Sequence, residues 1–234
     1  MRIFDDAVEM RREVERDLFE MGVRYQSKTV QDKHVEDDPD FRTIELFGYS
    51  YSLTNFGGVK DMVKDSGKNL RWAETEAADR FESSLISCVN PGFAVTFDFA
   101  RWEPFMREGL LSYSYAERIR LQLPYVIHEL KSRPETRQAV ITIYDQHQDL
   151  MNFGGKDRVP CSIAYQLVLR NGELSMVYFQ RSCDFLEFFP TDVFLAVRLL
   201  EHVACQINSN CGRMIHSIGS LHAFAKDLEG RGVF

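Results

Sequence analysis

The sequence predicts an α+β fold in which a large mixed β-sheet is covered by helices. The dipeptide Asn171-Gly172 separates two apolar-rich segments, residues 163–170 and 173–182, and this is the strongest short-range signal for a β-hairpin with a two-residue turn. Residues 192–208 are apolar nearly all round, as in a helix buried at the centre of a protein. The predicted strands and helices are mixed without the strict βαβ alternation of a doubly wound fold.

The other elements are predicted from apolar periodicity and turn residues. Helices are expected over residues 4–21, 70–87, 102–107, 115–131 and 221–228, and strands over residues 43–53, 138–144 and 213–218. Gly22 suits a helix end, Gly48 indicates a bulge or bend in its strand, and Pro124 can kink its helix. We interpret residues 145–158 as a loop. No repeat or linker divides the chain, so a single domain over residues 1–234 is expected.

Composition excludes several classes of protein. A chain of 234 residues with 44% hydrophobic content can bury one sizeable core. The net charge of −7 argues against a nucleic-acid surface, although not against a local basic pocket. Five cysteines without paired metal spacing indicate reduced thiols and no metal centre. The terminus is charged from Asp5 onward and no apolar run approaches spanning length, so a cytoplasmic protein without membrane association is expected.

The hairpin gives Cys161 a chemical context. Arg170 should face Glu173, and without a bulge the same register places Cys161 opposite Ser182 and beside Arg181, at roughly 5 Å between Cβ atoms. A thiol next to an arginine has a lowered pKa and is a better nucleophile. A buried structural cysteine is the alternative for a lone Cys at a strand start.

Four motifs in order resemble the thymidylate synthase superfamily over about residues 110–225. They are Pro160-Cys161, the run Gln180-Arg181-Ser182-Cys183-Asp184, the run Pro190-Thr191-Asp192, and Ile-His-Ser-Ile-Gly-Ser-Leu-His-Ala-Phe over residues 215–224. The N-terminal third matches more loosely. The resemblance implies a thymidylate-synthase-like fold and a homodimer that forms through the sheet.

The resemblance also implies a reaction. In this superfamily a cysteine thiolate adds to C6 of a pyrimidine nucleotide, and C5 then attacks a one-carbon unit supplied by 5,10-methylenetetrahydrofolate. Cys161 matches that nucleophile. Tyr115 falls on the active-site tyrosine, and Glu76 is the best spaced candidate for the glutamate that helps to activate the base, with Glu74 nearly as good.

The phosphate of the nucleotide should be bound by several cationic side chains, because planar guanidinium groups bind phosphate in bidentate fashion. Arg181 and Ser182 match phosphate ligands of the family. Arg137 matches the first of two adjacent arginines donated across the dimer interface, but Gln138 replaces the second. Lys28 resembles the basic residue of an N-terminal phosphate loop, and a solvated surface charge is its alternative.

The remaining nucleotide contacts are implied by residues in the last three motifs. Gln180 belongs to the nucleotide-binding run. His222 matches the histidine that contacts the sugar, although a structural histidine is its alternative. Phe224 replaces the tyrosine expected two positions later, which leaves open whether a ribonucleotide is tolerated.

Asp192 is expected to decide the base. Thymidylate synthases have Asn at this position, whereas phage deoxycytidylate hydroxymethylases have Asp. A carboxyl group accepts from the exocyclic amine of cytosine and, when protonated, donates to N3. Against O4 of uracil a carboxylate would set acceptor against acceptor, at a cost of roughly 1–3 kcal/mol. The alternative is an ordinary aspartate at a helix start, with Thr191 available as the cap.

The folate side of the site is less specific. Asp184 matches the aspartate that hydrogen-bonds the pterin, with capping of local backbone amides as its alternative. Trp102 falls near a tryptophan that lines the folate region, with a core tryptophan as its alternative. Ser162 follows the nucleophile where thymidylate synthases have His. Only 12 residues follow His222, and a short lid that admits water favours a hydroxymethyl product.

The expected function is therefore a dCMP 5-hydroxymethyltransferase, which in this superfamily provides modified bases for phage DNA. Two alternatives remain open at this stage. One is a C5-methylating enzyme acting on dCMP or dUMP, and the other is a homodimer that binds nucleotides without catalysis.

Overall fold

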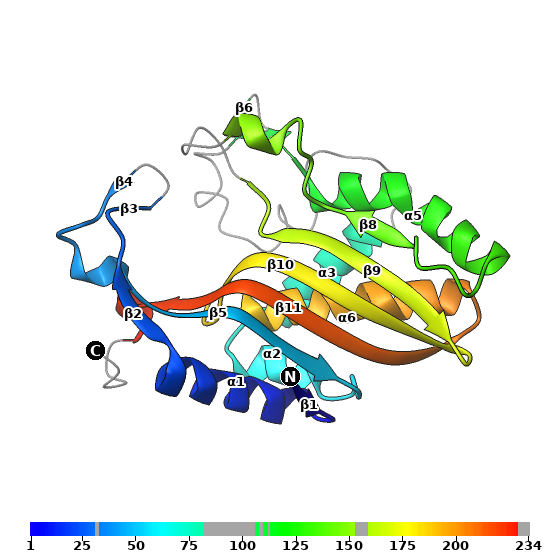
Figure 1. The fold of residues 1–234 in the computed structure, drawn as a ribbon, viewed down its shortest axis with the longest axis horizontal. Coiled ribbons are helices and arrows are strands. Elements are labelled where there is room, and N and C mark those ends of the chain that lie inside the picture. Colours follow the sequence, from blue (N-terminus) through cyan, green and yellow to red (C-terminus); the bar gives the residue numbers. More distant parts are fainter. Residues whose placement is uncertain (31–32, 82–105, 108–109, 112, 153–158, 229–234) are drawn as a thin grey trace.

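A seven-stranded mixed sheet organises the chain in the computed structural model, which describes residues 1–30, 33–81, 106–107, 110–111, 113–152 and 159–228 (Figure 1). The strand order is β1-β5-β11-β10-β9-β8, with β2 paired to β5. The pairs β1/β5 and β10/β11 are parallel and the others are antiparallel, which confirms the predicted mixed sheet. The strands are β1 (Arg2–Phe4), β2 (Val23–Gln26), β5 (Arg42–Leu53), β8 (Val140–Thr142), β9 (Ser162–Arg170), β10 (Glu173–Asp184) and β11 (Asn210–Phe224).

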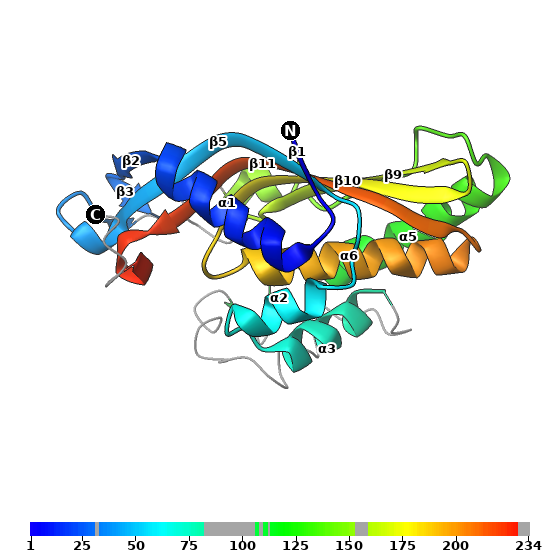
Figure 2. The same cartoon turned by 90° about the horizontal axis from the view of Figure 1, so that it is seen from below.

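The helices lie on one face of this sheet, and the described residues place no helix on the other face (Figure 2). They are α1 (Ala7–Met21), α2 (Val59–Asp65), α3 (Leu70–Phe81), α5 (Tyr115–Ser132) and α6 (Phe189–Gln206). Short 3-10 turns occur at η1 (Pro39–Phe41), η4 (Asp149–Asn152) and η5 (Ala225–Leu228), and two small hairpins pair β3 (Thr29–Val30) with β4 (Lys33–His34) and β6 (Met106–Arg107) with β7 (Leu110–Leu111). None of the helices in the described part of the chain is long and apolar enough to cross a membrane.

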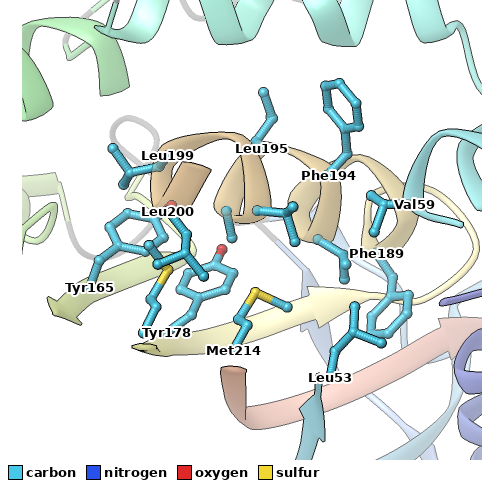
Figure 3. Packing of buried hydrophobic residues seen from close by; sticks show 14 of the residues in the cluster. Leu53, Val59, Tyr165, Tyr178, Phe189, Phe194, Leu195, Leu199, Leu200 and Met214 are labelled. Carbon is cyan, nitrogen blue, oxygen red and sulfur yellow. The ribbon is translucent and has the colours of Figure 1, made fainter. Parts of the chain in front are cut away.

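Helix α6 is buried because it lies between the sheet and other helices. Figure 3 shows Phe194, Leu195 and Leu199 pointing away from the strands. On its other side α6 meets Tyr178 and Met214, which rise from β10 and β11. This position explains why the sequence of α6 is apolar nearly all round.

The Asn171-Gly172 hairpin forms as predicted, but its register shifts once. Asn171 has φ 51° and Gly172 has φ 79°, as a type I′ turn requires. Pairing runs regularly from Arg170 opposite Glu173 to Ala164 opposite Phe179, and then Ser162 pairs with Gln180. The bulge therefore places Cys161 opposite Arg181, whose backbone N–H donates to the Cys161 carbonyl at 2.8 Å. The expected pairing of Cys161 with Ser182 was wrong.

Both ends of the chain differ from the predicted helices. The first helix begins at Ala7 because the Asp6 side chain caps it, accepting from the Glu9 N–H at 2.7 Å, and residues 2–4 form β1 instead. The predicted helix over residues 221–228 is largely wrong, since β11 continues to Phe224. Leu221 and Ala223 are buried at a spacing of two residues, the strand period, and pairing with β5 and β10 overrides any local helical preference.

The remaining differences are smaller. Residues 106–107 form a strand, so the predicted helix over 102–107 is wrong there, and its residues 102–105 lie outside the described residues, as do residues 82–87 of the helix predicted over 70–87. Helix α5 runs through Pro124. The strand at 43–53 is present as β5, where Gly48 has φ +64° without a shift in register.

Candidate active site

Cys161 carries an exposed thiol just before β9, and Arg181 lies against it. The Arg181 guanidinium donates from Nε to the Pro160 carbonyl and from Nη2 to the Val159 carbonyl, both at 2.9 Å. Nη2 is also 3.9 Å from Sγ of Cys161. The same cation therefore holds the backbone around the cysteine and faces its sulfur, which favours the thiolate form.

The second cysteine of this region has a different environment. Cys183 is 2% exposed, and burial raises the pKa of its thiol well above the ordinary value. A thiol that is hard to ionise is a poor nucleophile. Of these two neighbouring cysteines, only Cys161 is placed for chemistry.

Tyr115 and Glu76 approach the same region from the helices. The Tyr115 hydroxyl accepts from the backbone N–H of Ser162 at 3.4 Å, and burial raises the pKa of its phenol, so the hydroxyl stays protonated. The Arg80 guanidinium lies 4.3 Å from the centre of the Tyr115 ring and donates from Nε to Oε1 of Glu76 at 2.6 Å. Glu76 is 2% exposed, whereas Glu74 is exposed and pairs with Lys60.

Sequence reasoning missed Arg80. The i,i+4 spacing of Glu76 and Arg80 indicates an ion pair on one helix face. It does not indicate that the pair is buried or that Arg80 reaches Tyr115, because α3 and α5 are brought together only by the tertiary fold. Arg80 is also close enough to Asp192 for its charge to oppose the rise in the pKa of that carboxyl.

Asp192 lies in the first turn of α6 and its carboxylate points to β10. Oδ2 accepts from Nε2 of Gln180 at 2.7 Å. Burial raises the pKa of Asp192 to about 6, against the hydrogen bond from Gln180. Thr191 does not cap the helix as expected, because its hydroxyl donates to the Phe188 carbonyl at 2.8 Å. The carboxyl of Asp192 is thus held by a side chain and can be protonated near neutral pH.

A buried histidine continues this interaction into the sheet. His216 is fully buried between β10 and β5, with Nε2 2.9 Å from Oε1 of Gln180 and Nδ1 3.0 Å from the hydroxyl of Tyr51. Its ring stacks on Tyr178 at 4.4 Å between centres. Burial lowers the pKa of His216 to about 3, so the ring is neutral. Sequence reasoning assigned no role to Tyr51 or His216, and the inward alternation along β11 was the available signal for His216.

Ser182, Asp184 and His222 lie together where β10 and β11 end. Ser182 pairs with Ser220, and Asp184 pairs with His222. The Ser220 hydroxyl bonds to Glu45 and lies 3.4 Å from Nδ1 of His222. Oδ1 of Asp184 accepts from the N–H groups of residues 186 and 187 at 3.2 and 3.1 Å, and burial raises the pKa of this carboxyl. Asp184 therefore performs the capping role that was its alternative.

Two predicted site residues, Lys28 and Arg137, lie apart from this cluster. Lys28 is 75% exposed and lies 3.5 Å from Glu36. Arg137 is exposed three residues before β8, beside Gln166, whose Nε2 donates to the Arg137 carbonyl at 3.1 Å. Five residues of β9 separate Gln166 from Cys161, which is roughly 17 Å at about 3.4 Å per residue. Trp102 lies outside the described residues.

Among the residues that the structure describes, no group of three or more His, Cys, Asp and Glu side chains is arranged to hold a metal ion. The polar groups of the cluster are instead a thiol, a guanidinium, phenols and carboxyls. These groups suit covalent catalysis on a small polar substrate.

The family model of thymidylate synthase matches residues 95–231, which is more than half of the sequence, and the chain belongs to this family. Two solved structures share the fold over nearly the whole chain. Thymidylate synthase from T4 phage has a TM-score of 0.71 at 21% identity, covering 93% of this chain and 77% of that one. Thermostable thymidylate synthase A from Bacillus subtilis has a TM-score of 0.68 at 16% identity, covering 97% and 83%.

Curated relatives match a shorter segment. The deoxyuridylate hydroxymethyltransferase of Bacillus phage SP01 is 34% identical over 107 residues, which is 45% of this chain and 28% of that protein. The bifunctional dihydrofolate reductase-thymidylate synthase of Paramecium tetraurelia is 29% identical over 108 residues, 46% of this chain and 22% of that protein. The matched segment thus spans between a fifth and a third of the length of these relatives.

Proposed function

We propose that this protein transfers a one-carbon unit from 5,10-methylenetetrahydrofolate to C5 of a pyrimidine nucleoside monophosphate, with dCMP as substrate and a 5-hydroxymethyl product. The observation that carries the proposal is the exposed Cys161 thiol held 3.9 Å from Arg181 within the family motif. The folate supplies the carbon when bound, and Asp184 and Trp102 are the proposed residues that hold it.

In the proposed reaction Cys161 adds to C6 of the ring, and the electron pair moves to C5. Arg181 stabilises the thiolate before attack and binds the phosphate, together with Ser182. C5 bonds to the one-carbon unit, C5 gives up its hydrogen as a proton, and tetrahydrofolate leaves. A water then adds to the exocyclic methylene group and supplies the oxygen of the 5-hydroxymethyl product. The electron pair displaced onto C5 re-forms the C5–C6 double bond and expels Cys161 from C6. Tyr115, a protonated phenol beside the cysteine, is proposed to donate a hydrogen bond near the reacting carbons. Glu76, paired with Arg80, is proposed to order a water and to help activate the base.

Cytosine is the proposed base because of Asp192. Its pKa of about 6 allows a protonated carboxyl that donates to N3 and accepts from the exocyclic amine. Its orientation comes from Gln180. His222, beside Ser182 and Asp184 at the ends of β10 and β11, is the proposed sugar contact.

Hydroxymethylation rather than methylation is supported by the likeness to the phage SP01 hydroxymethyltransferase and by Ser162. The Ser162 hydroxyl is buried and lies 2.6 Å from the Tyr178 hydroxyl, where thymidylate synthases have His. A hydroxymethylated cytosine nucleotide is a precursor for modified phage DNA, which is the proposed setting.

The proposed active form is a homodimer that pairs through the face of the sheet without helices (Figure 2). Phe47 is 69% and Phe179 is 40% exposed on the sheet, and a second copy of the chain would cover them. Dimerisation would also bring Arg137 of one chain to the phosphate site of the other.

Release of tritium from C5-labelled dCMP and dUMP tests the proposal, with and without methylenetetrahydrofolate. We expect folate-stimulated release from dCMP, and no release from a Cys161→Ser variant that still binds nucleotide. Mass analysis of the product then distinguishes 5-hydroxymethyl-dCMP from 5-methyl-dCMP. Silence with both nucleotides despite binding would contradict catalysis and support the non-catalytic homodimer, which the replacements Gln138 and Phe224 favour.

The second candidate is the same chemistry on dUMP. It is favoured by the name of the phage SP01 relative, a deoxyuridylate hydroxymethyltransferase. Release from dUMP and not from dCMP would establish it and would make Asp192 an ordinary residue of the helix start.

A further inference from the structure

Three buried side chains behind Asp192 form one continuous chain of hydrogen bonds. It runs from the Tyr51 hydroxyl to Nδ1 of His216 (3.0 Å), from Nε2 of His216 to Oε1 of Gln180 (2.9 Å), and from Nε2 of Gln180 to Oδ2 of Asp192 (2.7 Å). Tyr51 and His216 are fully buried and Gln180 is 3% exposed. Water cannot replace these bonds, so each donor needs its acceptor.

The donors of this chain all point the same way. The amide oxygen of Gln180 faces His216, so Nε2 of the histidine must be the nitrogen that carries hydrogen. His216 is neutral, which leaves Nδ1 as an acceptor for the Tyr51 hydroxyl. The last donor in the series is the amide N–H of Gln180, and it ends on Oδ2 of Asp192.

We propose that the chain Tyr51–His216–Gln180 makes the Asp192 carboxyl asymmetric, keeping Oδ2 an acceptor and leaving Oδ1 as the oxygen that carries the proton. We further propose that this asymmetry sets the choice between cytosine and uracil. The second part rests on the proposed function of Asp192 as the group that meets the base. Tyr51 and His216 are positioning residues, since they act on the base only through Gln180.

The asymmetry matters because a free carboxylic acid matches both bases. With the proton on one oxygen it donates to N3 of cytosine and accepts from the N4 amine. With the proton moved to the other oxygen, the same group donates to O4 of uracil and accepts from N3–H. The Gln180 amide, which donates to Oδ2, prevents the proton from moving to that oxygen, because a protonated Oδ2 would then face the N–H of Gln180. With uracil bound, the N3–H donor would face the protonated Oδ1, and the O4 acceptor would face the acceptor Oδ2.

The direction of the chain can be measured directly. In the full-length protein labelled with nitrogen-15 histidine, the spectrum of His216, assigned with a His216→Gln variant, should show the tautomer with hydrogen on Nε2. Hydrogen on Nδ1 would mean that the chain runs the other way and donates to Tyr51, with the proton on Oδ2 of Asp192. That result would overturn the inference whatever the substrate is.

The effect on base choice is tested by dissociation constants for dCMP and dUMP, measured by calorimetry. Gln180→Met removes the amide donor to Oδ2 and leaves the weak thiol contact of Cys183 at 4.0 Å. We expect the preference for dCMP over dUMP to fall about tenfold, the size of one hydrogen bond to a charged or polar group. Tyr51→Phe should lower it by about threefold. Tyr49→Phe is the matched control, because it removes a hydroxyl from the same strand that bonds to Asp17 at 2.7 Å outside the chain, and it should leave the preference unchanged.

An Asp192→Asn variant separates the two ways of failing. If Asp192→Asn changes the preference for dCMP while Gln180→Met does not, the proposed role of the chain Tyr51–His216–Gln180 is wrong, and Asp192 still recognises the base. If the wild-type protein binds both nucleotides equally and Asp192→Asn changes nothing, the proposed base recognition is wrong, and the His216 tautomer alone decides the direction of the chain.

Discussion

The two ends of the proposed nucleotide site are built in different ways. At the base end, Asp192, Gln180, His216 and Tyr51 come from α6, β10, β11 and β5 of one chain and are bonded to one another at 2.7–3.0 Å. At the phosphate end, Arg181 lies against Cys161. Lys28 is exposed, and Arg137 lies beside Gln166 of β9, five residues along the chain from Cys161. The sheet pre-organises the base end, and we infer that the phosphate end is completed by the second chain of a dimer.

The largest change in activity is expected when Cys161 and Arg137, which are proposed to complete one site from two different chains, are substituted in separate variants. Arg137→Ala removes a charge-assisted phosphate contact, and we expect activity on dCMP to fall about 10- to 100-fold. Cys161→Ser should be inactive. When the two variants are mixed and allowed to exchange subunits, half of the dimers are mixed and each contains one intact site, so about a quarter of wild-type activity should return.

Arg133→Ala is the matched control for this experiment. Arg133 is an exposed arginine of the same connection and pairs with Glu129 of its own chain at 2.5 Å. Its variant should be as active as the wild type. If the mixture of Arg137→Ala and Cys161→Ser stays inactive although subunits exchange, Arg137 does not act across an interface.

The next effect concerns the stability of the base end. The folded-state pKa of Asp192 is about 6 and its ordinary value is 3.8, so the folded protein prefers the protonated form. Below about pH 4 both folded and unfolded states are protonated and the carboxyl costs nothing. Between about pH 4 and 6 the unfolded state releases the proton first, and the folded state loses stability on the order of 2–3 kcal/mol, which persists at higher pH.

Asp192→Asn should therefore stabilise the nucleotide-free protein at pH 8 and not at pH 4. Unfolding by urea at both pH values measures the difference, with the surface variant Asp5→Asn as control. The Asn oxygen can still accept from Gln180, so the comparison removes the charge and keeps the bond. A difference that does not depend on pH would show that Asp192 is not protonated in the folded protein near neutral pH.

The smallest effect is expected at Lys28. Its ammonium is 75% exposed and paired with Glu36, and exposed ion pairs of this kind contribute about 0–1 kcal/mol. Lys28→Ala should weaken dCMP binding by less than about threefold in a titration calorimeter. A loss of tenfold or more would restore Lys28 to the phosphate site and weaken the contrast between the two ends.

The sequence predicted best where one short stretch carries both structure and chemistry. The Asn171-Gly172 turn sets the pairing of β9 with β10, so Cys161 and Arg181 were expected side by side and are. The exact partner was wrong by one residue, because a bulge between Ala164 and Ser162 leaves no mark in the sequence. A register shift of this kind is decided by tertiary packing.

Residues that meet across long separations could not be predicted. Arg80 reaches Tyr115 through the packing of α3 on α5, and Tyr51 reaches His216 through strand pairing across 165 positions. Neither contact has a local pattern. The end of β11 was mistaken for a helix for the same reason, since its neighbours β5 and β10 decide its conformation.

The most direct test of the account is the trapping of a covalent adduct with 5-fluoro-dCMP. Fluorine at C5 cannot leave as a proton does, so the adduct with the cysteine and the folate should accumulate. Incubation with methylenetetrahydrofolate, followed by digestion and mass spectrometry, should find nucleotide and folate together on the peptide that contains Cys161, with 5-fluoro-dCMP and not with 5-fluoro-dUMP. An adduct on another cysteine, none at all, or one formed only with 5-fluoro-dUMP would contradict the account.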